Sequence, residues 1–189
     1  MDSRKLLALL ACATLFTSCA TRDRDHRMVI SVPEQRMVVF KNNEPIAEYP
    51  VSTSKFCLSD APGSRGTPLG ELEIAKKIGA NAPLGMKFHN RRATGEIVAP
   101  DAPGRDPIVS RILWLRGLQQ QNRHAYGRYI YIHGTAEEAK IGEPASFGCI
   151  RMKSTDVIQL FNTVGIGARV EIVNQPFAQA AAAAVATGG

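Results

Sequence analysis

One histidine and one cysteine are spaced so that, in the right fold, their side chains could carry out nucleophilic catalysis together. His133 follows the alternating run Tyr129-Ile130-Tyr131-Ile132, and fifteen residues lie between it and Cys149. A free thiol has a pKa of about 8.5, so little of it is thiolate at neutral pH, but a neighbouring imidazole can take its proton. The resulting imidazolium can protonate a leaving amine. The pair therefore predicts Cys149 as the nucleophile and His133 as its proton acceptor and donor.

The residues beside the pair suggest supporting roles. An imidazole needs a third group to fix its tautomer, and no Asp or Asn lies close to His133 in sequence, so a backbone carbonyl such as that of Gly134 is the candidate. Gly148 permits a tight turn, which would let the amides of Gly148 and Cys149 face a developing oxyanion. Arg151 would lie on the same side as Cys149 in an extended segment, where it could bind a substrate carboxylate.

Each of these residues also has an ordinary structural interpretation. A single Cys is usually a small buried apolar residue, and a single His is usually a hydrogen-bonded structural one. Their joint occurrence with glycines and a following Arg favours a catalytic site. His89 and His124 are interpreted as non-catalytic, and no close-spaced ligand pair supports a zinc site that they would form with His133 and Cys149. We expect neither a metal nor a cofactor.

The two motifs resemble a known family. His133-Gly134-Thr135, the spacing, and the run from Ser146 to Met152 (SFGCIRM) are similar to those of the L,D-transpeptidases of the YkuD type. The similarity extends upstream to a strand pair around residues 28–51 and to the turn Thr67-Pro68-Leu69-Gly70. It therefore covers about residues 28–173 and implies an L,D-transpeptidase catalytic domain there.

One position departs from the family pattern. Many members carry His where this chain has Phe147. That side chain is not the base, so the Cys–His pair is kept, and any difference is expected in acceptor selection or pocket polarity. Together with Arg151, we expect Ser146, Phe147, Tyr131 and Thr135 to contact the substrate.

The resemblance implies acyl transfer on peptidoglycan stem peptides. Cys149 would attack the carbonyl of the L-centre of diaminopimelate in a tetrapeptide stem, and D-Ala would leave as an amine protonated by His133. The acceptor amine could belong to a second diaminopimelate, giving a 3–3 cross-link, to a lysine of an envelope lipoprotein, or to a free D-amino acid. Two alternatives stay open: an L,D-carboxypeptidase or endopeptidase in which water resolves the same thioester, and a non-catalytic lipoprotein that binds the cell wall.

The N-terminus has the features of an exported lipoprotein. An apolar run from Leu6 to Phe16 is too short to span a bilayer but suits a secretory signal. It leads to Cys19 in a setting that resembles a bacterial lipobox, with Cys12 as a competing candidate. We expect residues 1–18 to be a signal peptide and Cys19 to be the lipidated N-terminus, with plain cleavage nearby as the alternative. Either way, the expected location is the periplasm or cell envelope.

The remaining expectations concern charge and the ends of the chain. A net charge of +6 suits anionic cell-wall peptides or phospholipid headgroups, while the scattered basic residues and predicted export argue against nucleic acid. Residues 21–27 alternate in charge sign and lack apolar side chains, so residues 19–27 are predicted to form a solvated tether. The Ala-rich residues 174–189 are predicted to form a disordered or weakly helical tail. Cys57 is expected to be an unpaired, mostly buried thiol, although a redox-controlled bridge to Cys149 stays open. We expect a monomer.

The elements that would position the site are mostly strands. Alternating apolar residues and turn signals predict an opening antiparallel meander and further strands, over residues 28–32, 37–40, 46–51, 71–74, 108–115, 129–132 and 168–173. Ser154-Thr155-Asp156, followed by apolar residues at helical spacing and ended by Gly165, predicts a prominent helix. We predict one domain, a mixed β-sandwich of the L,D-transpeptidase type, with this helix and short helical segments.

Overall fold

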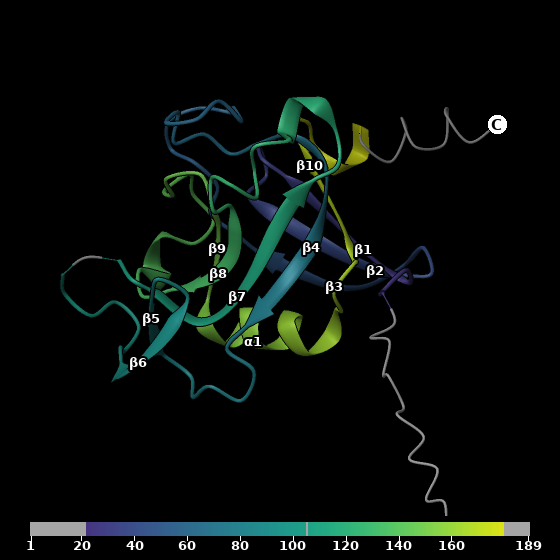
Figure 1. Ribbon diagram of the computed structural model, residues 1–189. Coiled ribbons are helices and arrows are strands. Elements are labelled where there is room, and N and C mark those ends of the chain that lie inside the picture. Colours follow the sequence, from purple (N-terminus) through teal and green to yellow (C-terminus); the bar gives the residue numbers. More distant parts are fainter. Residues whose placement is uncertain (1–21, 105, 180–189) are drawn as a thin grey trace, which may run out of the picture.

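The strands of the computed structural model, which describes residues 22–104 and 106–179, form one curled mixed sheet (Figure 1). The strands are β1 (His26–Ser31), β2 (Arg36–Lys41), β3 (Glu44–Pro50), β4 (Gly70–Ile78), β5 (Met86–His89), β6 (Arg92–Ile97), β7 (Ile108–Gly117), β8 (Tyr131–Thr135), β9 (Ile150–Met152) and β10 (Arg169–Val173). The helix α1 spans Ser154–Thr163, and two short 3-10 helices, η1 and η2, span Gln120–Asn122 and Glu138–Lys140.

The order of the strands places the site at a branch of the sheet. The main path runs β3-β2-β1-β10-β4-β7-β5-β6, and β8 branches from it by pairing with both β7 and β9. The first three strands pair antiparallel, which confirms the predicted meander. Two pairs are parallel, β1 with β10 and β8 with β9. The predicted fold class, mainly β with one prominent helix, is confirmed.

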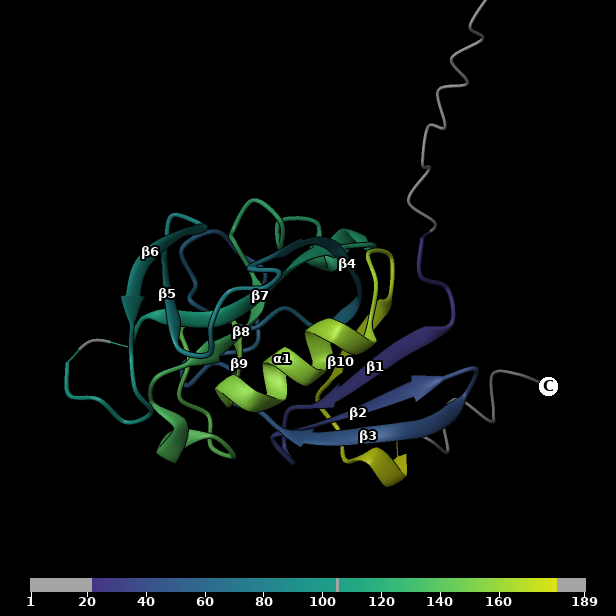
Figure 2. The same cartoon turned by 90° about the horizontal axis from the view of Figure 1, so that it is seen from below.

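Helix α1 covers the part of the sheet that carries the candidate site. It lies against β7 and β8 (Figure 2). Its residues Val157, Leu160 and Phe161 are buried in a core that also contains Leu113 of β7 and Ile132 of β8. A fully buried side chain of this size contributes about 1.5–3 kcal/mol, so the helix holds these two strands firmly. In the described residues, no helix has the length and apolar character needed to cross a membrane.

The start of α1 differs from the prediction. The apolar spacing is confirmed, but Ser154 does not cap the helix: Lys153 is the N-cap residue and makes no side-chain cap hydrogen bond. Instead, the Ser154 amide donates to the carboxylate of Glu138 in η2, over 2.8 Å. A carboxylate at a helix N-terminus satisfies a free amide and interacts favourably with the helix dipole. A side chain from another element therefore replaces the predicted local cap.

The N-terminal segment is packed on the domain rather than solvated where the structure describes it. The Asp23 amide donates to Ile166 O over 2.8 Å, and its carboxylate accepts from the Gly165 amide over 2.6 Å. Arg22 forms an ion pair with the buried Glu73. The solvated-tether prediction is thus wrong for Arg22, Asp23 and Arg27, whose charged side chains find partners far away in the sequence. Arg24 and Asp25 are exposed, as a solvated tether would be. The predicted signal peptide, Cys19 and the rest of the tether lie outside the described residues.

The first residues of the predicted tail are also held by the domain. The Phe177 amide donates to the Glu34 carboxylate over 2.9 Å, and the Ser31 hydroxyl donates to Gln175 O over 2.9 Å. Residues 174–179 therefore lie against the turn between β1 and β2. The remainder of the predicted tail, residues 180–189, lies outside the described residues.

Candidate active site

Two neighbouring parallel strands carry the candidate catalytic residues. In the register of β8 and β9, Ile132 pairs with Ile150 and His133 with Arg151. Cys149 directly precedes β9, so it lies opposite Tyr131, two residues before His133. Side chains two residues apart on a strand project from the same face. The topology therefore places the thiol and the imidazole on one face, offset by two residues, as catalysis requires.

The strand that carries His133 is displaced from its predicted position. The alternating run predicts a strand over residues 129–132 that ends just before His133, but β8 begins at Tyr131 and continues to Thr135. Tyr129 has φ +60°, a left-handed conformation that is incompatible with a strand. His133 consequently lies in the middle of β8, where pairing on both sides fixes its backbone.

His133 is buried, and its tautomer is fixed. The residue is 5% exposed, and its Nδ1 lies 2.9 Å from Gly134 O. A carbonyl only accepts hydrogen bonds, so Nδ1 carries the proton and Nε2 is free to accept one. The Gly134 carbonyl therefore lies where its predicted role in orienting His133 requires. Burial lowers the pKa of His133, against the opposing effects of Gly134 O and Asp106, so the ring is neutral at pH 7.

Gly134 is also required by close packing. A Cβ at this position would lie 2.6 Å from Val109 O on β7 and 3.1 Å from a methyl carbon of Val157 on α1. The first of these distances is too short for any side chain. Glycine therefore lets β7 and α1 approach the strand that holds His133.

The Cys149 thiol is half-buried on the wall of a cavity. Its Sγ donates to Tyr129 O and accepts from the Tyr131 amide, each over 3.4 Å. The cavity has a volume of about 440 Å³ and is lined by Gly63, Arg65, Arg128, Ile130, Phe147 and Cys149. Burial raises the pKa of Cys149 to about 11, although the Tyr131 amide and the charges of Arg151 and Arg128 oppose the shift. The thiol is therefore protonated at neutral pH and needs a base.

No hydrogen bond is formed between the Cys149 thiol and the His133 ring. Among the hydrogen bonds of residues 22–104 and 106–179, none joins the Cys149 sulfur to the His133 ring; the thiol is held by the backbone of β8 and of the residues before it. Catalytic hydrogen bonds are often formed only once substrate is bound. The structure thus places the two residues on one face without a hydrogen bond between the thiol and the ring.

The turn before Cys149 is held by hydroxyl groups. Gly148 has φ +120°, which favours glycine, and a Cβ there would lie 2.9 Å from Gly66 O. The Gly148 amide donates to Ser146 Oγ over 3.1 Å, and Thr67 Oγ1 donates to Gly148 O over 3.1 Å. The predicted oxyanion role of the Gly148 amide is therefore wrong, because Ser146 already accepts its proton. Ser146 is buried and shapes this turn, so it does not contact substrate as predicted.

Arg151 does not face the site as a free cation. It is 5% exposed, and its guanidinium contacts Asp106 Oδ2 at 3.1 Å and Glu137 Oε2 at 2.9 Å. The prediction that it binds a substrate carboxylate is not supported, because two carboxylates of the chain already occupy it. Thr135 is likewise buried and donates to Asp106, against its predicted contact with substrate. Asp106 and Glu137 were missed because no local pattern marks a partner 14 to 45 residues away.

The other predicted substrate contacts lie around the thiol. Phe147 is 54% exposed, lines the cavity and packs on Phe56 with 5.3 Å between ring centroids. Tyr131 is buried, meets Trp114 edge to face at 5.5 Å, and its hydroxyl lies 3.5 Å from Arg91 Nη1. Phe147 is thus placed to meet substrate through its ring, whereas Tyr131 meets the thiol through its backbone.

Cys57 is free but not buried. The prediction of an unpaired thiol is confirmed, and the prediction of burial is wrong because the residue lies exposed on the surface loop between β3 and β4. Its Sγ donates to Ser64 O over 3.5 Å.

Comparisons with known proteins identify the family to which the chain is similar. The YkuD model, the L,D-transpeptidase catalytic domain, matches residues 25–172. YqjB of Bacillus subtilis (strain 168), which carries the L,D-transpeptidase name, is 30% identical over 150 residues, covering 79% of this chain and 72% of YqjB. YbiS of Escherichia coli (strain K12) is 40% identical over 105 residues, but these cover 53% of this chain and only 30% of YbiS.

A solved structure shares the fold. The crystal structure of L,D-transpeptidase 3 from Mycobacterium tuberculosis in complex with a faropenem-derived adduct has a TM-score of 0.52 and 16% sequence identity, covering 80% of this chain and 60% of that one. At this identity the likeness concerns the fold, and the family match carries the assignment. The chain belongs to the L,D-transpeptidase catalytic domain family.

Proposed function

We propose that this protein is a cysteine acyltransferase that performs L,D-transpeptidation on peptidoglycan stem peptides. The observation that carries the proposal is the placement of Cys149, on a cavity wall, on the same face as a neutral His133. The fixed Nδ1 proton directs the free Nε2 toward the role of base. Membership of the family supports the substrate class.

The first half-reaction forms a thioester. Rotation about the Cα–Cβ bond of Cys149 releases Sγ from the backbone of β8 and brings it to Nε2 of His133. The thiol proton passes to Nε2 as Sγ bonds to the carbonyl carbon of the diaminopimelate L-centre. The Cys149 amide, which donates to no oxygen of the described residues, is the oxyanion donor in this proposal. The C–N bond then breaks, and the D-Ala amine takes the proton from His133.

The second half-reaction transfers the acyl group. An acceptor amine attacks the thioester carbon and gives a proton to His133, the C–S bond breaks, and the proton returns to Sγ. The acceptor is a second diaminopimelate, a lysine of an envelope lipoprotein or a free D-amino acid. Because Phe147 replaces a His of many relatives and is exposed beside the thiol, an apolar wall favours an amine over water at this point. Hydrolysis of the same thioester is the second candidate function.

The setting of the reaction is proposed from the sequence. The lipobox-like residues before Cys19 and the basic balance of the chain support a lipid-anchored protein of the periplasm that meets peptidoglycan as a monomer.

The experiment that tests the proposal is incubation of the purified protein with disaccharide-tetrapeptide, with the products identified by mass spectrometry. Cross-linked dimers indicate transfer, tripeptide alone indicates hydrolysis, and unchanged substrate would contradict an enzymatic role. Cys149→Ala should abolish either activity. Cys57→Ala is the matched control, because it removes the other free thiol of the described residues from an exposed position and should keep the activity.

A further inference from the structure

The two arginines whose charges act on the thiol, Arg151 and Arg128, are already paired. Arg151 is buried against Asp106 and Glu137. Arg128, which lines the cavity, contacts Asp60 Oδ1 at 2.9 Å and donates to Gly66 O over 2.8 Å. A guanidinium already held in this way has few donors left for a ligand. If the site recognises an anionic substrate, another cation must do so.

Arg91 is a cation with free donors that lies on aromatic residues neighbouring the thiol. It lies in the tight turn between β5 and β6, where Asn90 and Arg91 have φ +49° and +66°. Its guanidinium carbon lies 4.8 Å from the ring centroid of Tyr129 and 5.3 Å from that of Trp114. Among the described residues no carboxylate forms an ion pair with it, and its side-chain hydrogen bond is the long one, 3.5 Å, to the Tyr131 hydroxyl.

Stacking on the aromatic rings leaves the N–H donors at the edge of the Arg91 guanidinium free to bind a ligand. Aromatic rings interact with the face of a guanidinium, whereas carboxylates bind bidentately to its edge. The rings of Tyr129 and Trp114 thus hold Arg91 in place without consuming its five N–H donors. A stacked arginine is less free to move, so less conformational entropy is lost when it binds an anion.

The same aromatic residues hold the nucleophile. Tyr129 O and the Tyr131 amide are the two backbone groups that contact Cys149 Sγ at 3.4 Å. Arg91 therefore lies on the side chains of the two residues whose backbone positions the thiol. A substrate that is bound at Sγ and extends over these side chains would meet this guanidinium.

We infer that Arg91, stacked on Tyr129 and Trp114, binds a carboxylate of the stem peptide and determines the specificity of the site for it. The inference rests on the proposed function and names the part of the substrate that is read. Two carboxylates lie close to the scissile amide, that of the terminal D-Ala and that of the diaminopimelate side chain. Both offer the same chemistry to a guanidinium.

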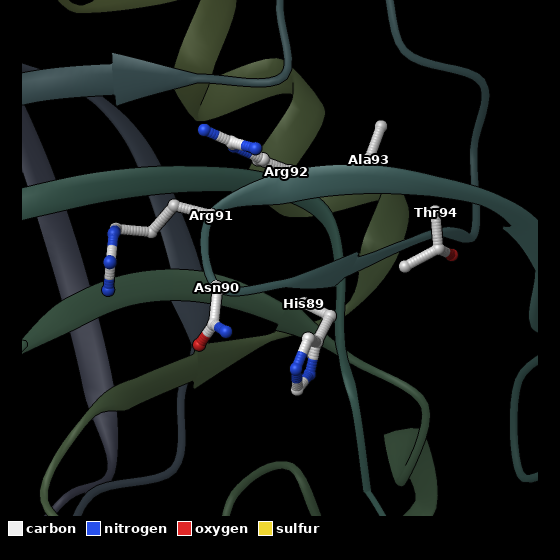
Figure 3. Close-up of a pocket in the computed structure, with 6 residues that line it drawn as sticks. All are labelled: His89, Asn90, Arg91, Arg92, Ala93 and Thr94. Atoms are coloured by element: carbon white, nitrogen blue, oxygen red, sulfur yellow. The ribbon is translucent and has the colours of Figure 1, made fainter.

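The adjacent arginine provides a matched control. In Figure 3 the side chains of His89, Asn90 and Arg91 project to one side of the hairpin, and those of Arg92 and Ala93 to the other. Arg92 is exposed and carries the same charge at the neighbouring position. Arg65, which lines the cavity and lies over the rings of Phe56 and Phe147, is the competing cation.

The test measures binding without chemistry. In a Cys149→Ala background, titration calorimetry gives the Kd of disaccharide-tetrapeptide and of two analogues, amidated at D-Ala or at the diaminopimelate side chain. Arg91→Gln should raise the Kd of the parent ligand at least about tenfold, as expected for loss of a charge-assisted hydrogen bond. The analogue that lacks the carboxylate bound by Arg91 should bind the Cys149→Ala protein as weakly as the parent ligand binds the Arg91→Gln variant. Its Kd should not rise further with Arg91→Gln, and this result identifies the carboxylate. Arg92→Gln should leave the Kd unchanged, and Arg65→Gln, which alters the lining of the cavity, should raise the Kd less than Arg91→Gln does.

Several results would overturn the inference. These are a parent Kd unaffected by Arg91→Gln, an equal loss for all three ligands, an equal loss in Arg92→Gln or Arg65→Gln, and no measurable binding of the tetrapeptide. Activity of the protein with Cys149 intact separates the two claims. Arg91-dependent binding without turnover contradicts the proposed function alone, and normal turnover with unchanged Kd in Arg91→Gln contradicts the inference alone.

Discussion

At the scale of single residues, the site contains a neutral pair rather than an ion pair. Burial raises the pKa of Cys149 to about 11 and lowers that of His133. Both shifts have the same cause, because removal from water disfavours the charged form of each group. The resting state is then thiol and imidazole, and the thiolate forms only as the sulfur attacks.

The raised pKa of Cys149 predicts how the free thiol reacts. In the Cys57→Ala variant, which removes the exposed thiol, the rate of alkylation of Cys149 by iodoacetamide should keep rising with pH beyond 9, because only the thiolate reacts. Peptide mass spectrometry follows the modification. A rate that levels off below about pH 8 would show a thiolate–imidazolium pair instead.

The lowered pKa of His133 predicts the acid side of the pH profile. The native state binds fewer protons than the unfolded state between the lowered pKa and the ordinary value of 6.5. Stability therefore falls as the pH drops below about 6.5. In contrast, kcat/KM depends on the folded protein, so it should hold below 6.5 and decline only as the pH falls through the lowered pKa of His133. Urea unfolding of the protein and of His133→Asn at several pH values measures the change in stability, and the variant should lose the pH dependence that His133 contributes. A protein whose stability rises on acidification through this range would contradict the assignment.

At the scale of the elements, the residues behind His133 are held by a buried ion pair. Asp106 accepts from Thr135 Oγ1 and the Ala136 amide and contacts Arg151 at 3.1 Å. These contacts hold the end of β8, whose Gly134 carbonyl fixes the imidazole. The side chains of Arg151 and Asp106 are 6% and 10% exposed. Removing the Asp106 charge would leave the buried Arg151 with Glu137 as its one remaining carboxylate partner among the described residues.

Asp106→Asn should therefore be strongly destabilising. Breaking a buried pair costs about 3–5 kcal/mol, and we expect a loss of about 3 kcal/mol in the free energy of urea unfolding. The control is Lys140→Ala, which breaks the exposed pair with Glu137 and should cost less than about 1 kcal/mol. Equal effects of the two substitutions would refute a structural role for the buried pair.

The strands and the helix that could be predicted from the sequence are those marked by a local periodic pattern. Alternation in β1 to β3 and helical spacing in α1 predicted those elements, because each buries one face on the core. The first residue of β8 and the cap of α1 were missed. The former depends on a left-handed Tyr129 and the latter on Glu138 from another element. Neither leaves a periodic signal.

The residues of the candidate site also fall into two groups, those that the local sequence predicts and those that depend on distant partners. Cys149, His133 and the Gly134 carbonyl were predicted because chemistry restricts which residue types can act and the motif places them together. The roles of Arg151, Thr135, Ser146 and the Gly148 amide were not, because their partners are distant in the sequence or compete locally for the same proton.

At the scale of the whole molecule, the N-terminal segment is part of the domain. Asp23 links the start of β1 to the loop after α1 by accepting from the Gly165 and His26 amides. Burial opposes ionisation of Asp23, but these amides and the His26 ring lower its pKa overall. Any anchor attached before residue 22 would therefore pull on the domain itself.

Asp23→Asn tests this attachment. The loss should be about 1–2 kcal/mol in urea unfolding at pH 7, as expected for charge-assisted hydrogen bonds. Because the folded pKa lies below the ordinary 3.8, the contribution of Asp23 is present above that value and disappears as the pH falls through the lowered pKa. Asp25→Asn, at an exposed position, is the control and should change stability little. A neutral Asp23→Asn would mean that this segment is not held in solution.

The central claim is that one sulfur atom, Cys149 Sγ, becomes covalently acylated with help from His133. The most direct test is intact-protein and peptide mass spectrometry of the protein quenched in acid during turnover of disaccharide-tetrapeptide. We predict a mass increase equal to the substrate minus D-Ala, located on the peptide that contains Cys149 and strongly reduced in His133→Ala. Turnover without this adduct, or an adduct on Cys57 instead, would contradict the account.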